Sequence, residues 1–490
     1  MVDLVVIHPG AAHGIYGELG NRLTALEPPL WSRLISGYIR KRGWDVKIID
    51  AEAEGWGPKQ VAQKVQELDP SLVCIAVYGH QPSASTQQMV SAREIASALG
   101  KIGSAIIMVG GHVAALPART LWEEPVSYAC NGEGPVTIEG LLQYYKGRFG
   151  ASLLKIPGLV YWDGADKPIS NPPAPLIEDL SEFGDGSWDD LPMEKYRAHN
   201  WQCFGDLAQM QPYASIYTSL GCPHACVFCC IHAPFNSRRY RMRDPKEVIT
   251  EIKYLYEKYQ VRTFKIIDEL FVLNEKHYTT IARGIVDAGL GDKINIWAYA
   301  RVDTVREGHL ALLRAAGIQW LALGIESGSK YVRDGAQKRL KNDDIAAVVK
   351  SVQDAGINVI GNYIFGLPDD NRITMQETLD LALELNTEFM NAYVAMAYPG
   401  SPLYKEALEK GWILPETWRG YSQHNDDCRP LDTQHISGAE VLAFRDQAFI
   451  TYFSSDRYQT MIREKFGEET LVHVQEMLRY RLPRKLVAAA

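Results

Sequence analysis

The run Gly221-Cys222-Pro223-His224-Ala225-Cys226-Val227-Phe228-Cys229-Cys230 places four of the chain's eight cysteines within nine residues. Three of them, Cys222, Cys226 and Cys229, follow the spacing C-x3-C-x2-C. The segment before them, 214–219, alternates and is rich in β-forming residues, which predicts a strand leading into a cysteine-bearing loop. Thiolates this close together suit an iron–sulfur cluster, and three ligands leave one iron of a four-iron cluster open for a chelating ligand.

Two other interpretations of the cysteine run remain open. A closed tetrahedral zinc site needs a fourth ligand, and His224, Cys230 or His232 could supply it. Buried structural cysteines are the second alternative, which the crowding of the four thiols disfavours. Cys230 adjoins the third ligand on the opposite backbone face, so we interpret it as a bystander.

The segment 206–410, which contains the cysteine run, repeats strand and helix and predicts a (β/α)6 partial TIM barrel. Each expected strand ends at a polar residue or a glycine, and function in α/β barrels gathers at that rim. The expected strands are 216–219, 263–267, 294–298, 320–324, 359–364 and 388–396.

Residues 1–150 predict a Rossmann-like, doubly wound parallel sheet, because short apolar strands alternate with helices. The expected strands are 4–7, 46–49, 72–77, 105–109 and 128–130. Ligands bind at the carboxyl ends of such strands, where this chain has clusters of glycine. No G-x-G-x-x-G follows the first strand, so the segment lacks the dinucleotide-binding fingerprint.

Two further segments complete the predicted organisation. Residues 151–205 predict a hairpin with an Asp163-Gly164 turn and an extended, proline-rich linker. Residues 411–490 predict helices over 439–452 and 460–480 that form a region capping the substrate.

Composition limits the classes of partner and the compartment. The 490 residues carry a net charge of −8 without a basic block, which disfavours nucleic acid as a partner and favours a small-molecule substrate. No apolar run approaches the roughly 18 residues of a membrane span, and no signal peptide is recognisable. Scattered single cysteines fit a reducing compartment, so we expect a cytoplasmic protein.

The cysteine spacing, with the aromatic Phe228 before the last cysteine, resembles the signature of the radical S-adenosylmethionine (SAM) superfamily. The resemblance implies a [4Fe-4S] cluster whose open iron is chelated by the amino and carboxylate groups of SAM. It also implies that one electron, from a reductant such as flavodoxin or ferredoxin, cleaves SAM to methionine and a 5′-deoxyadenosyl radical.

The same resemblance implies a SAM-binding rim on the predicted barrel. A carboxylate after the second strand would accept from the ammonium group, and Arg301 can fork to a carboxylate. Plain alternatives are a rim salt bridge between Arg301 and Glu326, and ordinary turns at the glycines. The predicted SAM-binding residues are Phe228, Asp268, Glu269, Arg301, Gly324, Glu326, Ser327, Asn362 and Gly366.

The N-terminal segment resembles the cobalamin-binding domain of the B12-dependent radical SAM enzymes. The D-x-H-x-x-G motif, which carries a histidine to the lower face of cobalt, is absent. The resemblance therefore implies that cobalamin binds without such a histidine ligand. For His8, His13, His80 and His112 we expect a structural role rather than cobalt ligation. The predicted cobalamin-binding residues are Pro9, Gly10, Glu27, Pro28, Gly79, His80, Ser83, Ser85, Gly110, Gly111, His112, Gly132, Glu133 and Gly134.

Together these features resemble the class B methylases, which implies methylation of an unactivated carbon of a small molecule or natural product. The methyl group would pass through methylcobalamin to a substrate radical made by the 5′-deoxyadenosyl radical. Cyclisation, ring contraction or oxidation without methyl transfer is the alternative within the family, and a non-catalytic corrinoid or iron–sulfur carrier or sensor is the alternative outside it. Candidates for contact with substrate or for hydrogen donation are Tyr393, Tyr398 and Cys428.

Overall fold

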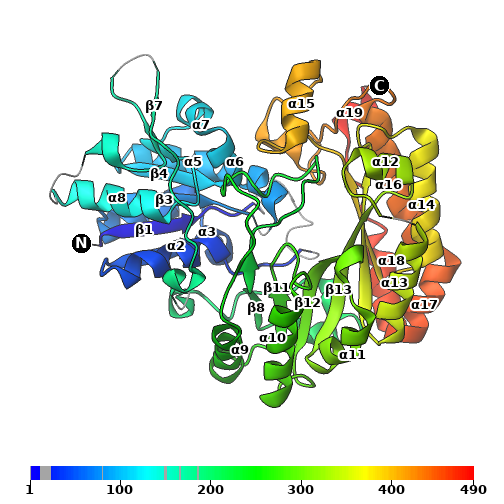
Figure 1. Cartoon of the computed structure of the whole chain (residues 1–490). Coiled ribbons are helices and arrows are strands. Elements are labelled where there is room, and N and C mark those ends of the chain that lie inside the picture. The colour runs from blue at the N-terminus through cyan, green and yellow to red at the C-terminus, as the bar shows by residue number, and fades with distance from the viewer. Residues whose placement is uncertain are drawn as a thin grey trace.

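The computed structural model contains two β-sheets, each with its own helices, placed side by side (Figure 1). The first sheet is drawn in blue and cyan and the second in green and yellow, with the last helices in orange and red on the outer side of the second unit. The structure describes residues 2–11, 24–79, 81–147, 152–164, 167–184, 187–340 and 342–489. The predicted sites at His13 and His80 lie outside these residues.

The first sheet confirms the predicted doubly wound architecture. Its central strands are apolar and wholly buried, as expected for parallel strands covered on both faces. Five parallel strands run in the order β2-β1-β3-β4-β5. They are β1 (Leu4–His8), β2 (Val46–Asp50), β3 (Leu72–Val77), β4 (Ile106–Gly110) and β5 (Tyr128–Cys130).

Helices cover both faces of this sheet. One apolar core joins the sheet to α2 and α8, and the other joins it to α4 and α5. The helices of this unit are α2 (Leu30–Lys41), α3 (Ala51–Glu54), α4 (Pro58–Leu68), α5 (Met89–Gly100), α6 (Gly111–Ala115), α7 (Pro117–Glu123) and α8 (Pro135–Tyr145).

The first sheet continues past the predicted boundary at residue 150. The predicted hairpin is present as β6 (Leu159–Tyr161) and β7 (Ile169–Ser170), and it adds two antiparallel strands beyond β5. The hairpin of the predicted segment 151–205 is therefore part of the first sheet. The rest of the connection contains short 3-10 turns at Leu180–Phe183, Trp188–Asp190, Asn200–Cys203 and Leu207–Met210.

The second sheet has six parallel strands in chain order, β8-β11-β12-β13-β14-β15, which confirms the predicted (β/α)6 repeat. The strands are β8 (Tyr213–Ile216), β11 (Thr263–Ile266), β12 (Asn295–Arg301), β13 (Ile318–Glu326), β14 (Asn358–Phe365) and β15 (Phe389–Val394). The helices are α9 (Pro245–Tyr259), α10 (Glu275–Asp287), α11 (Glu307–Ala315), α12 (Lys330–Gly335), α13 (Asn342–Asp354), α14 (Arg372–Leu385) and α15 (Pro402–Lys410).

The first strand of the second sheet differs from the prediction. We expected 216–219, but β8 ends at Ile216. Thr218 donates its backbone N–H and its hydroxyl to the Asp268 carboxylate, at 2.6 and 2.5 Å, and so leaves the ladder. The chain then forms β9 (Ser219–Leu220), which pairs antiparallel with β10 (Arg241–Met242). The cysteine run is therefore a loop closed at its base by these two short strands.

The C-terminal segment is helical, as predicted, with one difference. The predicted helix over 460–480 is divided, because Gly467 adopts φ 88° and breaks the helical path. The helices are α16 (Gly438–Ser454), α17 (Asp456–Phe466), α18 (Glu468–Met477) and α19 (Lys485–Ala488). Among the described residues, no helix has the length and apolar character that crossing a bilayer requires.

Buried ion pairs join the two units. Glu133, which follows β5, accepts from Arg241 of β10 at 2.7 Å and from the backbone N–H of Ile177 at 3.0 Å. Arg33 of α2 pairs with Glu251 of α9 at 2.9 Å. Charges removed from water need such partners, so these contacts fix how the first sheet meets the cysteine loop.

We expect Glu133→Gln to lower the stability of the full-length, cofactor-free protein by about 3–5 kcal/mol, because it leaves the Arg241 guanidinium buried without its counter-charge. Thermal melting followed by circular dichroism measures the effect. The matched control is Glu67→Gln, which breaks the exposed Lys64–Glu67 pair and should cost at most about 1 kcal/mol. Equal melting temperatures for the two variants would contradict the role of the buried pair.

Candidate active site

The cysteines Cys222, Cys226 and Cys229 lie half-buried on the loop between β9 and β10. They are close enough to influence one another electrostatically, and burial raises the pKa of the Cys222 thiol to about 11. Thiolates at such a site need a strong positive charge beside them, which iron supplies. The donor set therefore fits an iron–sulfur cluster.

A single metal ion fits this loop less well. Tetrahedral zinc draws its sulfur ligands to within about 4 Å of one another. Among the described residues, no group of three or more His, Cys, Asp or Glu side chains is arranged to hold one ion. Cys230 is buried, and burial raises the pKa of its thiol to about 12.

Arg301, at the end of β12, lies against the cysteine loop. Its Nη1 donates to Cys226 Sγ at 3.7 Å. Two bonds of 2.9 Å to Asp303 and one of 3.1 Å to the Lys338 carbonyl hold the guanidinium in place. Arg301 and Glu326 do not form the salt bridge considered as an alternative, because Arg301 pairs with Asp303 and Glu326 pairs with Lys338.

Glu326, at the end of β13, pairs with Lys338 at 2.6 Å. Its backbone has φ 69°, which a side chain rarely adopts, and this turns the carboxylate back across Gly324. A Cβ on Gly324 would lie 2.6 Å from Glu326 Oε1 and 2.7 Å from Lys338 Nζ. A side chain at Gly324 would therefore force the ends of the Glu326 and Lys338 side chains to shift. Sequence reasoning missed Lys338 and Asp303, which lie outside the strand ends that guided it.

The two acids after β11 have different environments. The Asp268 carboxylate accepts from Thr218 twice and from the Ser219 hydroxyl at 2.6 Å, so it holds the base of the cysteine loop. Glu269 is half-buried, and its buried Oε2 has no hydrogen-bond partner among the described residues. Burial, with Asp268 nearby, raises the pKa of Glu269 to about 7. Of the two predicted acids, Glu269 is thus the one available to a cationic ligand.

The remaining predicted SAM residues occupy several environments. Ser327 accepts from the Ser329 N–H at 3.2 Å, and the Gly366 N–H donates to Asp370 at 3.0 Å, so both are engaged within the protein. Asn362 accepts from Asn391 at 2.9 Å beside the central cavity. Phe228 is partly buried against the apolar clusters around α12 and α15.

Both acids predicted to contact cobalamin are paired across the two units. Glu27 meets Lys265 of β11 at 3.0 Å and also accepts from the Tyr213 hydroxyl at 3.3 Å. Glu133 meets Arg241. The neighbouring Pro28 carbonyl accepts from Ser215 at 3.3 Å. These residues bind one unit to the other, and Glu27 also lines the central cavity.

The predicted glycines at the carboxyl edge of the first sheet are largely used by the protein's own packing. A Cβ on Gly79 would lie 2.5 Å from Ala84, and one on Gly110 would lie 2.3 Å from the Val77 carbonyl oxygen. Gly10, after Pro9, has φ 71° and packs on Glu52. The Gly79 N–H donates to Ser85 at 3.1 Å. Gly132 and Gly134 have φ 149° and 112°, and Gly111 begins α6.

The described histidines differ in their surroundings. His8 lies 3.5 Å from Glu52. His112, in α6, is buried with both ring nitrogens lacking a partner among the described residues, and burial lowers its pKa to about 3. Its ring lies 4.9 Å from that of Trp418, a residue of the C-terminal segment.

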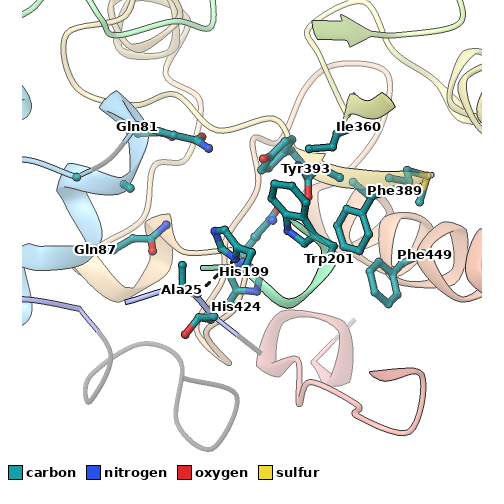
Figure 2. Close-up of a pocket in the computed structure, with 18 of the residues that line it drawn as sticks. Ala25, Gln81, Gln87, His199, Trp201, Ile360, Phe389, Tyr393, His424 and Phe449 are labelled. Atoms are coloured by element: carbon teal, nitrogen blue, oxygen red, sulfur yellow. Dashed lines mark hydrogen bonds between the residues drawn. The ribbon is translucent and has the colours of Figure 1, made fainter. Parts of the chain in front are cut away.

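A cavity of about 440 Å³ lies where the two units meet (Figure 2). The first unit contributes Gly79, Gln81, Ser83, Ala84, Gln87 and Gln88, and the second contributes residues of β11, β12, β14 and β15. Gln81 donates to the Tyr299 hydroxyl at 2.5 Å and so links the two walls. Of the three predicted catalytic candidates, Tyr393 and Tyr398 line the cavity, whereas the buried Cys428 is not among the lining residues.

The cavity wall from the first unit fits a ligand rich in amides. Gln81, Gln87 and Gln88 line it, and Gln88 Oε1 is buried without a hydrogen-bond partner among the described residues. A buried amide oxygen without a donor is costly, so a ligand N–H would stabilise it. The amide-bearing rim of a corrin supplies such donors.

Comparisons with known proteins agree with this division. Residues 216–382 match the Radical SAM superfamily, and residues 19–142 match the B12 binding domain. An uncharacterized methyltransferase of Pyrococcus horikoshii is 29% identical over 90% of both chains. The anaerobic magnesium-protoporphyrin IX monomethyl ester cyclase of Cereibacter sphaeroides is 26% identical over 90% of this chain and 68% of its own.

The fold also matches a solved structure. The radical SAM methyltransferase TsrM of Kitasatospora setae, with cobalamin and a [4Fe-4S] cluster bound, superposes with a TM-score of 0.70 at 16% identity. The match covers 97% of this chain and all of that one. The arrangement of both sheets is therefore shared over nearly the whole chain.

Variants of the two neighbouring acids should behave differently. In the cofactor-free protein, the raised pKa of Glu269 favours the folded state at low pH, and this contribution is lost as the pH rises from about 4.5 to about 7. We therefore expect Glu269→Gln to melt near the wild-type temperature at the acid end and above it at neutral pH.

Asp268→Asn should melt lower at both ends of that range, because an amide nitrogen cannot accept from Thr218 or Ser219; we expect a loss of about 2–3 kcal/mol. Thermal melting across the pH series measures both variants. A Glu269→Gln protein that is destabilised like Asp268→Asn would show that Glu269 has a structural role instead.

Proposed function

We propose that this chain, which belongs to the cobalamin-dependent radical SAM enzymes, methylates an unactivated carbon of a small-molecule substrate. Its cofactors are a [4Fe-4S] cluster, SAM and cobalamin. One observation carries the proposal: the carboxyl edge of the first sheet and strands β11, β12, β14 and β15 of the second sheet border a single cavity, so a substrate there would lie between the two cofactor-binding units. The methyltransferase names of the Pyrococcus and Kitasatospora proteins support methyl transfer as the reaction.

When bound, the cluster and SAM supply a carbon radical that removes hydrogen, and cobalamin carries a methyl group. Cys222, Cys226 and Cys229 would hold the cluster. Arg301 would offer Cys226 a charged hydrogen bond, and Glu269 would accept from the ammonium group of SAM. The Asp268 contacts keep the base of the loop fixed relative to these groups.

Both units contribute residues to the wall of the substrate cavity. Tyr393 and Tyr299 are half-buried in its wall, and burial raises the pKa of Tyr393 to about 12, so its hydroxyl stays protonated at neutral pH. We propose that Tyr393 contacts the substrate and keeps it oriented toward both cofactors. Position matters because radical transfer depends on the reacting atoms being close.

A second candidate keeps the cofactors without methyl transfer. The similarity to the Cereibacter cyclase favours it, since that chain is 26% identical over most of this one. A non-catalytic carrier is disfavoured, because a carrier has no need of the buried Glu269 Oε2 beside the cysteine loop, which has no hydrogen-bond partner among the described residues.

Products from SAM distinguish these functions. The reconstituted protein, with hydroxocobalamin, SAM, a flavodoxin or ferredoxin reducing system and candidate substrates, should yield 5′-deoxyadenosine and S-adenosylhomocysteine, quantified by mass spectrometry. 5′-Deoxyadenosine without S-adenosylhomocysteine would favour the cyclase-like reaction, and the absence of both would favour a carrier.

Cys226→Ala should abolish the brown absorbance of the cluster and all cleavage of SAM, a loss of at least about a thousandfold in 5′-deoxyadenosine formation. Cys230→Ala is the matched control, because its thiol is buried beside the loop, and it should keep both properties. SAM cleavage that survives in Cys226→Ala would refute the assignment of the cluster ligands.

A further inference from the structure

The central cavity has two chemically different walls (Figure 2). Gln81 and Gln87 lie on the side of the first unit, whereas Trp201, Phe389 and Phe449 lie on the opposite side. Trp201 stacks on Phe389 with 5.7 Å between ring centroids. Aromatic faces of this kind contact flat, apolar ligands well.

Arg445 of α16 lines the same cavity and is held tightly. Its side chain is nearly buried, with the residue 7% exposed. Nε donates to the Ala392 carbonyl at 2.7 Å and Nη1 donates to Asp446 at 2.8 Å. Among the described residues Nη2 has no acceptor, and the guanidinium carbon lies 5.5 Å from the centre of the Phe449 ring. The Arg445 guanidinium is thus held in a fixed position beside the aromatic wall, with Nη2 available to donate to a ligand.

Among the described residues, Arg445 has one carboxylate partner, Asp446. Asp446 is shared, because Arg484 donates to it twice, at 2.7 and 2.9 Å. Two guanidiniums therefore share one carboxylate. The nearby His424 contributes no negative charge, and its imidazole is neutral at neutral pH because burial lowers its pKa to about 3. A buried excess positive charge is costly, and an anion in the cavity would offset that cost.

We propose that the substrate has an apolar body with a ring system and an acidic group, a carboxylate or an anion of similar chemistry. The aromatic wall of Trp201, Phe389 and Phe449 contacts the body, and Arg445 receives the acidic group. This inference rests on the proposed function, since it takes the cavity as the substrate site. It adds a substrate class that the cofactors alone do not specify.

Binding of two matched probes tests the proposal in the cluster-reconstituted, cobalamin-loaded protein. Naphthylacetate and naphthylacetamide have the same ring body, and only the first carries a charge. Equilibrium dialysis should show the acid binding about tenfold more tightly than the amide, the effect of one charge-assisted hydrogen bond. Equal binding of the two probes, or binding of neither, would overturn the proposal.

Three variants locate the effect. Arg445→Gln should remove the preference for the acid, and Phe449→Ala should weaken both probes to the same extent. Asp446→Asn keeps Arg445 and removes its counter-charge, so it should strengthen binding of the acid alone, which keeps the test decisive should Arg445→Gln fail to fold. A preference for the acid that persists in Arg445→Gln would refute Arg445 as the substrate anion site.

The outcome is separable from that of the proposed function. Probe binding is measured without turnover of SAM. A protein that forms no S-adenosylhomocysteine but prefers the acid probe would contradict methyl transfer and leave the acidic substrate class standing.

Discussion

The buried pair between Glu133 and Arg241 connects the two halves of this molecule at the point where its chemistry begins. Glu133 follows the last parallel strand of the first sheet, and Arg241 belongs to the short strand that closes the cysteine loop. One ion pair thus connects the carboxyl edge of the first sheet to the base of the cysteine loop. Glu27 and Lys265 make a similar connection at the wall of the cavity.

The cysteine loop is in turn fixed by groups at the ends of neighbouring strands. Asp268 accepts hydrogen bonds from Thr218 and Ser219 at the base of the loop. Arg301, the last residue of β12, donates to Cys226. Because parallel strands end at the same edge, side chains far apart in the chain meet there without a long connection. The unusual backbone of Glu326 belongs to the same arrangement, since it allows the Lys338 pair to form over Gly324.

Residues chosen by type at strand ends are divided between two tasks. Glu27, Glu133, Asp268 and Ser327 are polar residues at predicted sites, yet each is engaged by another part of the protein. Glu269, Gln88 and His112 retain buried polar atoms without partners among the described residues. A sequence shows that an acid follows a strand, but whether a neighbour neutralises it depends on chain segments that the local pattern does not contain.

The sequence by itself predicted the two α/β units and most of their strands, and it supplied the cysteine ligand set as a prediction. These features follow from local periodicity and spacing: buried parallel strands are continuous apolar runs, and three thiols within eight residues cannot be far apart. The early end of β8, the addition of β6 and β7 to the first sheet and the cavity at Arg445 were decided only by the tertiary structure. Each depends on a long-range partner, Asp268 for β8, β5 for the hairpin and Asp446 with Arg484 for the cavity, and such pairings arise from the folded arrangement rather than from neighbouring residues.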